Sequence, residues 1–220
     1  MQRDMALSFY RTAVGKKAVV AVTGIALALF LLVHMLGNLQ LFSGPEALNG
    51  YARFLHSKPA IVGLVRIVLV VVLVVHVTAT LQLFLQNRAA RPQGYRMRRY
   101  EEVDASSSTM VVTGPLVLAF LAYHLLHFTF GSAHPSFQPG DVYHNVVAGF
   151  SNWWVSGTYI LANLLLFLHL RHGLWSWFQT LGLAHPRYNH WRRWFAWALS
   201  LAIGIGNISM PVAVLAGWVR

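Results

Sequence analysis

The stretch AVVAVTGIALALFLLVHMLGNLQLF at residues 18–42 decides the fold class of this chain. It contains no Asp, Glu, Lys or Arg. A helix of about 20 apolar residues is long enough to cross the roughly 30 Å hydrocarbon core of a bilayer. Similar apolar stretches recur at residues 60–86, 110–130, 155–178 and 194–219. The sequence therefore predicts an all-α membrane protein, a single domain over residues 1–220 with five transmembrane helices.

The composition excludes the soluble class. Hydrophobic residues make up 56% of the 220 residues, and charged residues make up 10%. A soluble protein can bury one all-apolar helix, but a chain of this length cannot cover five of them in water. The chain has no cysteine, which excludes structural disulfides and any iron–sulfur cluster or haem held by its own thiolates.

Basic residues gather in alternate segments of this topology. These segments are the N-terminus, the loop after the second helix and the loop before the fifth, with Arg3, Arg11, Lys16, Lys17, Arg88, Arg91, Arg96, Arg98, Arg99, Arg187, Arg192 and Arg193. The positive-inside rule places the N-terminus in the cytoplasm and the C-terminus outside, as in a multi-pass protein of a bacterial cytoplasmic membrane. The net charge of +11 reflects this topology, attraction to anionic lipid or docking of a soluble partner. Nucleic-acid binding is not needed to explain it.

Four histidines lie well inside four different predicted helices: His34, His76, His124 and His169. With a rise of about 1.5 Å per residue, His34 and His124 lie roughly 22–26 Å from the cytoplasmic face, and His76 and His169 roughly 15–18 Å from it. Two neutral imidazoles fill both axial positions of a haem, so that its iron carries electrons. The two depths therefore predict a helical bundle that encloses two haem b groups, each held by two histidines.

The spacing of other histidines leaves the ligand choice partly open. His127 follows His124 by three residues, and His172 follows His169 by three, so either member of each couple lies near the same helix face. The depths favour His124 and His169 as ligands. We expect His127 and His172 to meet haem propionates or water.

Small and aromatic residues accompany the histidines. Gly37 lies three residues after His34, and Gly173 lies four residues after His169, so both leave room for a flat macrocycle on the ligand face. Three aromatic residues suit an interfacial belt at the outer end of the fourth helix: Trp153, Trp154 and Tyr159.

Several motifs resemble one family of membrane anchors. They are VGKK (14–17), TG (23–24), HMLGNL (34–39), GDVYHNVV (140–147), HLRHG (169–173) and FQTLG (178–182). Together they are similar to the single-chain, five-helix, two-haem cytochrome b subunit of succinate dehydrogenase (complex II) or fumarate reductase. The resemblance runs from about residue 8 to residue 188, and the fifth helix contributes least to it.

The resemblance implies a function and partners. A flavoprotein and an iron–sulfur protein would sit on the cytoplasmic face, and this chain would conduct electrons between the iron–sulfur subunit and menaquinone in the respiratory chain. Succinate chemistry, a step of the tricarboxylic acid cycle, would belong to the flavoprotein, so we expect no catalytic residue here. By motif, His34 and His124 would hold the distal haem iron, and His76 and His169 the proximal one. A further expectation is that several copies of the whole complex assemble into a higher oligomer.

Residues at both ends are candidates for further contacts. The quinone is expected at the outer end, where the candidates are Tyr51, His56, Asn38 and Gln40, with His127 as a further hydrogen-bond partner. At the inner end, the candidates for haem propionates are Lys17, Arg171 and His172, and the two cations could equally snorkel to lipid phosphate. The alternative for each of these residues is an ordinary loop or interfacial role.

Two other functions remain open. The chain could be the cytochrome b anchor of a different respiratory oxidoreductase, such as a hydrogenase or a formate dehydrogenase. It could also be a transporter whose histidines hydrogen-bond across helix interfaces or relay protons. Proton-coupled transporters usually place acidic residues inside the membrane, whereas every Asp and Glu here lies outside the predicted helices or at their rims.

Overall fold

The computed structural model describes residues 8–90 and 109–220. Over these ranges it contains helices and no strand, and five of the helices are long and apolar enough to cross a membrane. The prediction of an all-α chain with five membrane-length helices is confirmed. Four basic residues assigned to the second cytoplasmic segment, Arg91, Arg96, Arg98 and Arg99, lie outside the described residues, as does Arg3.

The long helices run close to their predicted bounds. They are α2 (Ala13–Asn38), α4 (Pro59–Ala89), α6 (Met110–His124), α8 (Trp153–Thr180) and α9 (Asn189–Leu215). A 3-10 helix at Leu39–Ser43 extends α2, a π-helical turn at Leu125–Thr129 extends α6, and a 3-10 turn at Pro186–Tyr188 precedes α9. The predicted bounds mark the apolar part of each helix, and several helices continue beyond that part into polar residues.

The start of α2 shows how polar residues lengthen a membrane helix. It begins at Ala13, ahead of the predicted residue 18, because the Thr12 hydroxyl accepts a hydrogen bond from the Gly15 amide at 2.9 Å. This cap satisfies one of the four amides that a helix leaves unpaired at its start. The fifth helix likewise begins at Asn189 instead of residue 194, and it ends at Leu215 instead of residue 219.

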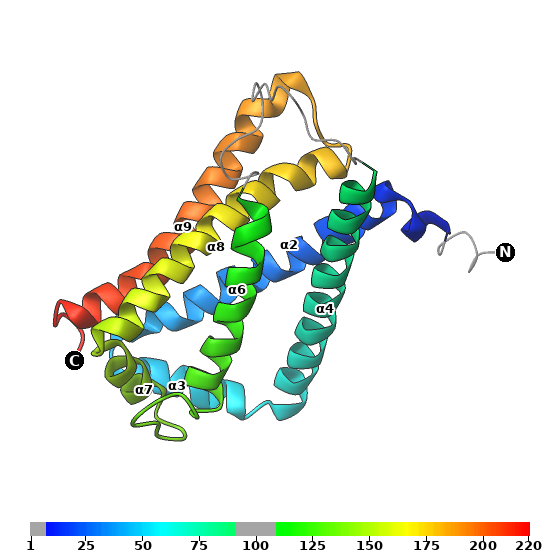
Figure 1. The fold of residues 1–220 in the computed structure, drawn as a ribbon. Coiled ribbons are helices and arrows are strands. Elements are labelled where there is room, and N and C mark those ends of the chain that lie inside the picture. The colour runs from blue at the N-terminus through cyan, green and yellow to red at the C-terminus, as the bar shows by residue number, and fades with distance from the viewer. Residues whose placement is uncertain (1–7, 91–108) are drawn as a thin grey trace.

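Two short helices, α3 (Pro45–His56) and α7 (Val142–Phe150), were not predicted. Gly44 precedes α3 with a φ of 95°, a conformation that favours glycine, and Pro45 occupies the first helical position. Asp141 caps α7 by accepting a hydrogen bond from the His144 amide at 2.9 Å. Both helices lie at the end of the bundle where α2 and α6 finish (Figure 1).

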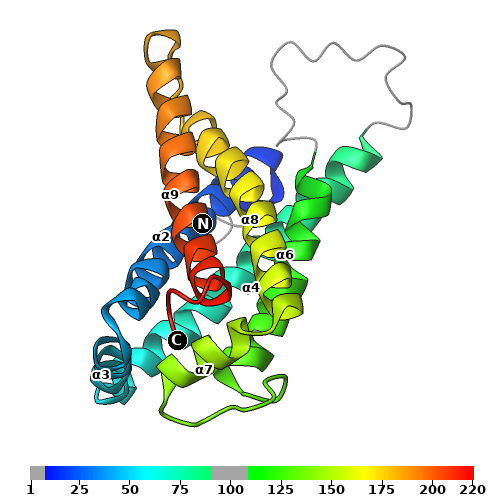
Figure 2. The same ribbon diagram turned by 90° about the vertical axis from the view of Figure 1, so that its left-hand side faces the viewer.

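The long helices alternate in direction, so the first helical residues and Arg220 lie at opposite ends of the bundle (Figure 1). The most extensive helix contacts join α8 to α9 and α2 to α4, while α6 packs against α8 and α2 also packs against α8. Helix α4 crosses the molecule beside α2, with Ala79 as its buried residue (Figure 2). Which end faces the cytoplasm remains a prediction.

Two buried clusters hold the bundle together. One lies under α3 and α7 and includes Leu41, Leu48, Phe150 and Tyr159. The other joins α2, α8 and α9 and consists of Ala28, Met35, Leu170, Leu174, Ala196 and Ile203. Many large apolar side chains on the long helices are exposed, as expected where a lipid tail is the solvent. The clusters thus fix α2 and α8, which carry two of the four candidate ligands.

Candidate functional site

His34 on α2 and His124 on α6 face each other. Their ring centroids are 5.9 Å apart, and the ring planes are perpendicular. Phe30 stacks on His34 with centroids 5.4 Å apart, and Phe120 lies 6.0 Å from His124. Two imidazoles that bind one metal through nitrogens about 2 Å from it have ring centroids roughly 6 Å apart. The observed spacing therefore matches a shared metal ion.

His76 on α4 and His169 on α8 form the second pair. Each ring approaches the backbone of another helix at a glycine. A Cβ atom on Gly24 would lie 3.3 Å from Cε1 of His76, and one on Gly114 would lie 3.7 Å from Cε1 of His169. Helices α2, α4, α6 and α8 thus all border this pair.

The hydroxyl of Thr23 fixes the tautomer of His76. It lies 3.0 Å from Nδ1 of His76 and donates its own proton to the Val19 carbonyl at 2.7 Å. Because that proton is used, the hydroxyl accepts from the ring, and Nδ1 of His76 carries the hydrogen. Nε2 then keeps its lone pair, which is the form that binds a metal.

The hydroxyl of Tyr159 bridges two histidines of the α6 segment. It lies 3.3 Å from Nδ1 of His124 and 3.1 Å from Nδ1 of His127. Tyr159 is 5% exposed and belongs to the buried cluster under α7, so its expected place in an interfacial belt is wrong. Trp153 and Trp154 are exposed, as that belt requires.

His127 belongs to the π-helical turn that follows α6, whereas His124 is the last residue of α6 itself. Its ring is fully buried and stacks on His134 with centroids 4.8 Å apart. A Cβ atom on Gly149 would lie 2.9 Å from Cε1 of His127, so α7 closes over this ring.

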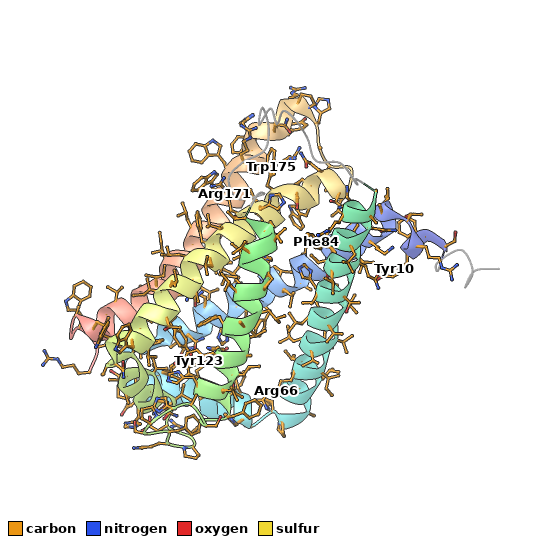
Figure 3. The ribbon with its side chains drawn as sticks, viewed as in Figure 1. Tyr10, Arg66, Phe84, Tyr123, Arg171 and Trp175 are labelled. Carbon is orange, nitrogen blue, oxygen red and sulfur yellow. The ribbon has the colours of Figure 1, made fainter. Side chains whose placement is uncertain are left out.

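The inner-end candidates lie on two helices, Lys17 on α2 and Arg171 and His172 on α8. The Arg171 guanidinium lies 4.3 Å from the centroid of the Trp197 ring, toward α9 (Figure 3). Lys17 is exposed. Contacts of these residues with haem propionates stay a prediction.

The outer-end candidates surround the turn between α2 and α3. A Cβ atom on Gly37 would lie 2.7 Å from the Tyr51 ring, so these two residues pack together. Asn38 donates to the His34 carbonyl at 2.9 Å, while Gln40 lies in the following 3-10 helix. His56 is exposed, and its Nδ1 bonds the Ala52 carbonyl within α3 at 2.8 Å. The structure therefore brings Gly37, Asn38 and Tyr51 near one another, with His56 further along α3.

The donor set suits a haem better than a bare metal ion. Among the described residues, no group of three or more His, Cys, Asp or Glu could hold a metal ion. A haem iron takes four ligands from its porphyrin and needs two axial ones from protein. Nδ1 of His169 is buried with no hydrogen-bond partner in the described ranges, and no atom lies within 4 Å of a Cβ built on Gly173. The paired imidazoles and the room at Gly173 fit an iron porphyrin.

An apolar groove of about 280 Å³ runs along α6 and α8. Phe120 and Tyr123 line it on α6, and Thr158 and Leu161 line it on α8. Tyr123 lies on the side of α6 nearest α8 (Figure 3), where its ring meets Tyr159. The groove offers a lipid-soluble molecule a position beside Phe120, which contacts His124.

Comparison of the chain with protein-family models, curated proteins and solved structures finds no match. The assignment of a function therefore depends on the geometry of the histidines and on the sequence motifs.

Sequence reasoning missed several residues around the site. Thr23 and Tyr159 position imidazoles, and neither role could be read without the helix packing. Lys16 is 7% exposed and donates to the Arg11 carbonyl at 3.0 Å and to Gln86 Oε1 at 3.3 Å. Lys16 therefore ties α2 to α4, whereas the sequence singled out its neighbour Lys17, as a contact for a haem propionate.

The surroundings of two arginines were not predicted either. Arg192 is 4% exposed, lies 4.3 Å from the centroid of the Trp175 ring and donates to Asn189 Oδ1 at 2.6 Å. Arg66 is an exposed cation within the apolar span of α4, near the end that follows α3 (Figure 3). A count of basic residues in loops overlooks a cation inside a span.

Proposed function

We propose that this chain is the di-haem cytochrome b membrane anchor of a succinate:quinone oxidoreductase. The observation that carries the proposal is the approach of His34 and His124 from separate helices to a ring separation of 5.9 Å. His76 and His169 supply a second pair at another level of the bundle. Two levels of paired imidazoles suit a chain that carries electrons across part of a membrane.

Each haem, when bound, supplies an iron that accepts and releases one electron. The residues of this chain bind and orient it. His34 and His124 would hold the distal iron, and His76 and His169 the proximal iron. Thr23 and Tyr159 hold two of the imidazoles by hydrogen bonds at Nδ1, which leaves Nε2 of His76 and of His124 for the metal. The apolar helices around both pairs exclude water.

The partners follow from the sequence motifs and the charge distribution. A flavoprotein subunit and an iron–sulfur subunit would dock on the basic face, and succinate would be oxidised, or fumarate reduced, on the flavoprotein. Menaquinone would exchange electrons and protons at the opposite end of the bundle, near Tyr51, His56, Asn38 and Gln40. The chain would span a bacterial cytoplasmic membrane with its N-terminus inside.

A redox difference spectrum of the purified chain tests the proposal. We expect dithionite to produce the absorption bands of a six-coordinate haem b, and a pyridine haemochrome assay to give two haems per chain. A chain without haem absorption would contradict the proposal and leave the transporter alternative. Co-purification of a flavin-containing subunit, with succinate-dependent haem reduction, would separate succinate:quinone oxidoreductase from the anchor of another enzyme.

Histidine substitutions test the pairing. We expect His34→Ala and His124→Ala to remove the same haem, and His76→Ala and His169→Ala to remove the other. His190→Ala is the matched control, because His190 is exposed at the start of α9 and should leave both haems in place. Depletion of one common haem by His34→Ala and His76→Ala would show that the pairing is wrong.

A further inference from the structure

We infer that the Tyr159 hydroxyl is a positioning group that selects His124, and not His127, as an iron ligand. The inference rests on the proposed function, since it concerns a ligand of the distal haem. It arises from one hydroxyl that lies within hydrogen-bond distance of Nδ1 on both imidazoles.

The Tyr159 hydroxyl carries a single proton. Tyr159 is buried, and the two Nδ1 atoms are the hydrogen-bond partners of its hydroxyl among the described residues. A phenolic hydroxyl donates one hydrogen bond and can accept others. It therefore donates to one imidazole and accepts from the other, so the two histidines hold opposite tautomers.

Opposite tautomers make the two histidines mutually exclusive as ligands through Nε2. If His124 donates from Nδ1, its Nε2 has a free lone pair, and His127 carries its hydrogen on Nε2. If His127 donates, Nε2 of His124 is protonated and cannot bind iron. One hydroxyl thus permits one ligand at a time.

The surroundings decide between the two arrangements. His124 lies against His34, the partner ligand, at 5.9 Å. His127 is enclosed by Phe128 and His134, whose ring centroids lie 4.2 Å and 4.8 Å from its own. His124, and not His127, therefore lies beside the partner ligand. Binding of iron through Nε2 of His124 requires the hydrogen on its Nδ1, so His124 donates to Tyr159 and His127 accepts. Nε2 of His127, which is buried without a hydrogen-bond partner among the described residues, then carries the hydrogen.

His134 packs against His127 from the far side. Its Nδ1 accepts from the Ser136 amide at 3.1 Å, so its Nε2 carries the hydrogen and donates to the Asn145 carbonyl at 2.9 Å. Both His134 nitrogens are therefore engaged, and the ring holds His127 in place by stacking. His134 and α7 thus enclose His127 beside Tyr159.

Tyr159→Phe tests the inference, because it removes the hydroxyl and keeps the ring. We expect the purified variant to retain both haems but to show a shifted EPR signal for the distal haem. The midpoint potential of the distal haem should rise, because the His124 imidazole loses its hydrogen-bond acceptor and donates less charge to the iron. Release of the distal haem to an acceptor protein should become about 10–100-fold more favourable. The proximal haem, which Thr23 supports, is the internal reference.

Tyr123→Phe is the matched control. Tyr123 stacks on His127 with centroids 5.4 Å apart and contacts Tyr159, but no hydrogen bond of its hydroxyl is found among the described residues. We expect this variant to keep wild-type spectra. A shift as large as that of Tyr159→Phe would assign the effect to ring packing and overturn the inference.

Nitrogen-15 NMR of labelled histidines in the reduced protein gives a second readout. We expect the Nε2–H tautomer for His127 in the wild type and a loss of that preference in Tyr159→Phe. Unchanged distal EPR, potential and tautomer in Tyr159→Phe would overturn the inference while the proposed function stands. A wild-type protein without haem would overturn both.

Discussion

The Thr23 hydroxyl on α2 lies 3.0 Å from Nδ1 of His76 on α4 and accepts a hydrogen bond from it. This contact joins the two helices and sets the imidazole so that Nε2 is free. The Tyr159 hydroxyl on α8 lies 3.3 Å from Nδ1 of His124 on α6. Each proposed haem thus has one ligand oriented by a hydroxyl group from another helix.

Thr23→Val should weaken the proximal haem site. Valine keeps the volume of threonine and removes the acceptor for His76, and loss of such a contact typically lowers metal affinity about 10–100-fold. The measurement is the rate at which haem transfers from the detergent-solubilised chain to an acceptor protein. Thr23→Ser, which restores the hydroxyl, should return the rate toward the wild-type value; equal rates for all three proteins would contradict the role of Thr23.

Gly24→Val should displace His76. A Cβ atom at Gly24 would lie 3.3 Å from Cε1 of His76, and the γ-methyl groups of valine would add further bulk beside the ring. We expect one of the two haems to be lost, as measured by pyridine haemochrome. Gly63→Val is the control, since no atom lies within 4 Å of a Cβ at that position. Retention of both haems in Gly24→Val would show that His76 can move without loss of ligation.

Lys16→Met should lower the stability of the bundle. The substitution removes hydrogen bonds from a charged group to the Arg11 carbonyl and to Gln86, which together should cost about 1–3 kcal/mol. Lys17→Met should change the free energy of unfolding by no more than about 0.5 kcal/mol, because Lys17 is exposed. Thermal unfolding in detergent compares the two. A haem signal altered by Lys17→Met with unchanged stability would support its predicted propionate contact.

The contact between α3 and α7 should weaken in acid. Hydrogen bonds from the His144 amide and from the Asn49 side chain lower the pKa of Asp141. A carboxyl whose folded pKa lies below its unfolded value of 3.8 stabilises the fold fully above that value and loses the effect as the pH falls through the folded pKa. Hydrogen exchange of α3 and α7 amides should therefore accelerate below about pH 4.

Asp141→Asn provides the control for this pH dependence. Asparagine keeps a side-chain oxygen that can accept from the His144 amide, but it does not titrate. Exchange in α3 and α7 should then vary little between about pH 3 and pH 6, after correction for the intrinsic rate. An acid-dependent acceleration of the same size in both proteins would assign it to other groups.

The orientation in the membrane can be tested with reporters fused after Arg220. Because the basic segments are expected in the cytoplasm, alkaline phosphatase at this terminus should be active and green fluorescent protein should be dark. The same reporters fused before the first helix should give the opposite pattern. Fluorescence at the C-terminus would invert the topology and move the predicted subunit-docking face to the other end.

Part of the candidate site could be predicted from the sequence, and part could not. The depth count along separate helices grouped His34 with His124, and the structure brings those rings together; whether they bind iron remains a prediction. Tyr159 was misassigned because an aromatic residue near a helix end reads as interfacial. Its burial follows from α7, a helix that hydropathy did not predict.

The sequence by itself determined that five helices are long and apolar enough to cross a membrane, because backbone groups in lipid must be satisfied within each helix and its length is a local property. The tertiary structure decided which hydroxyl groups meet the imidazoles, which of Lys16 and Lys17 is buried, and that His127 is enclosed against His134. These depend on how each helix is rotated about its axis. Helices that are apolar on every side carry no periodic pattern that would fix this rotation, so packing against distant segments fixes it.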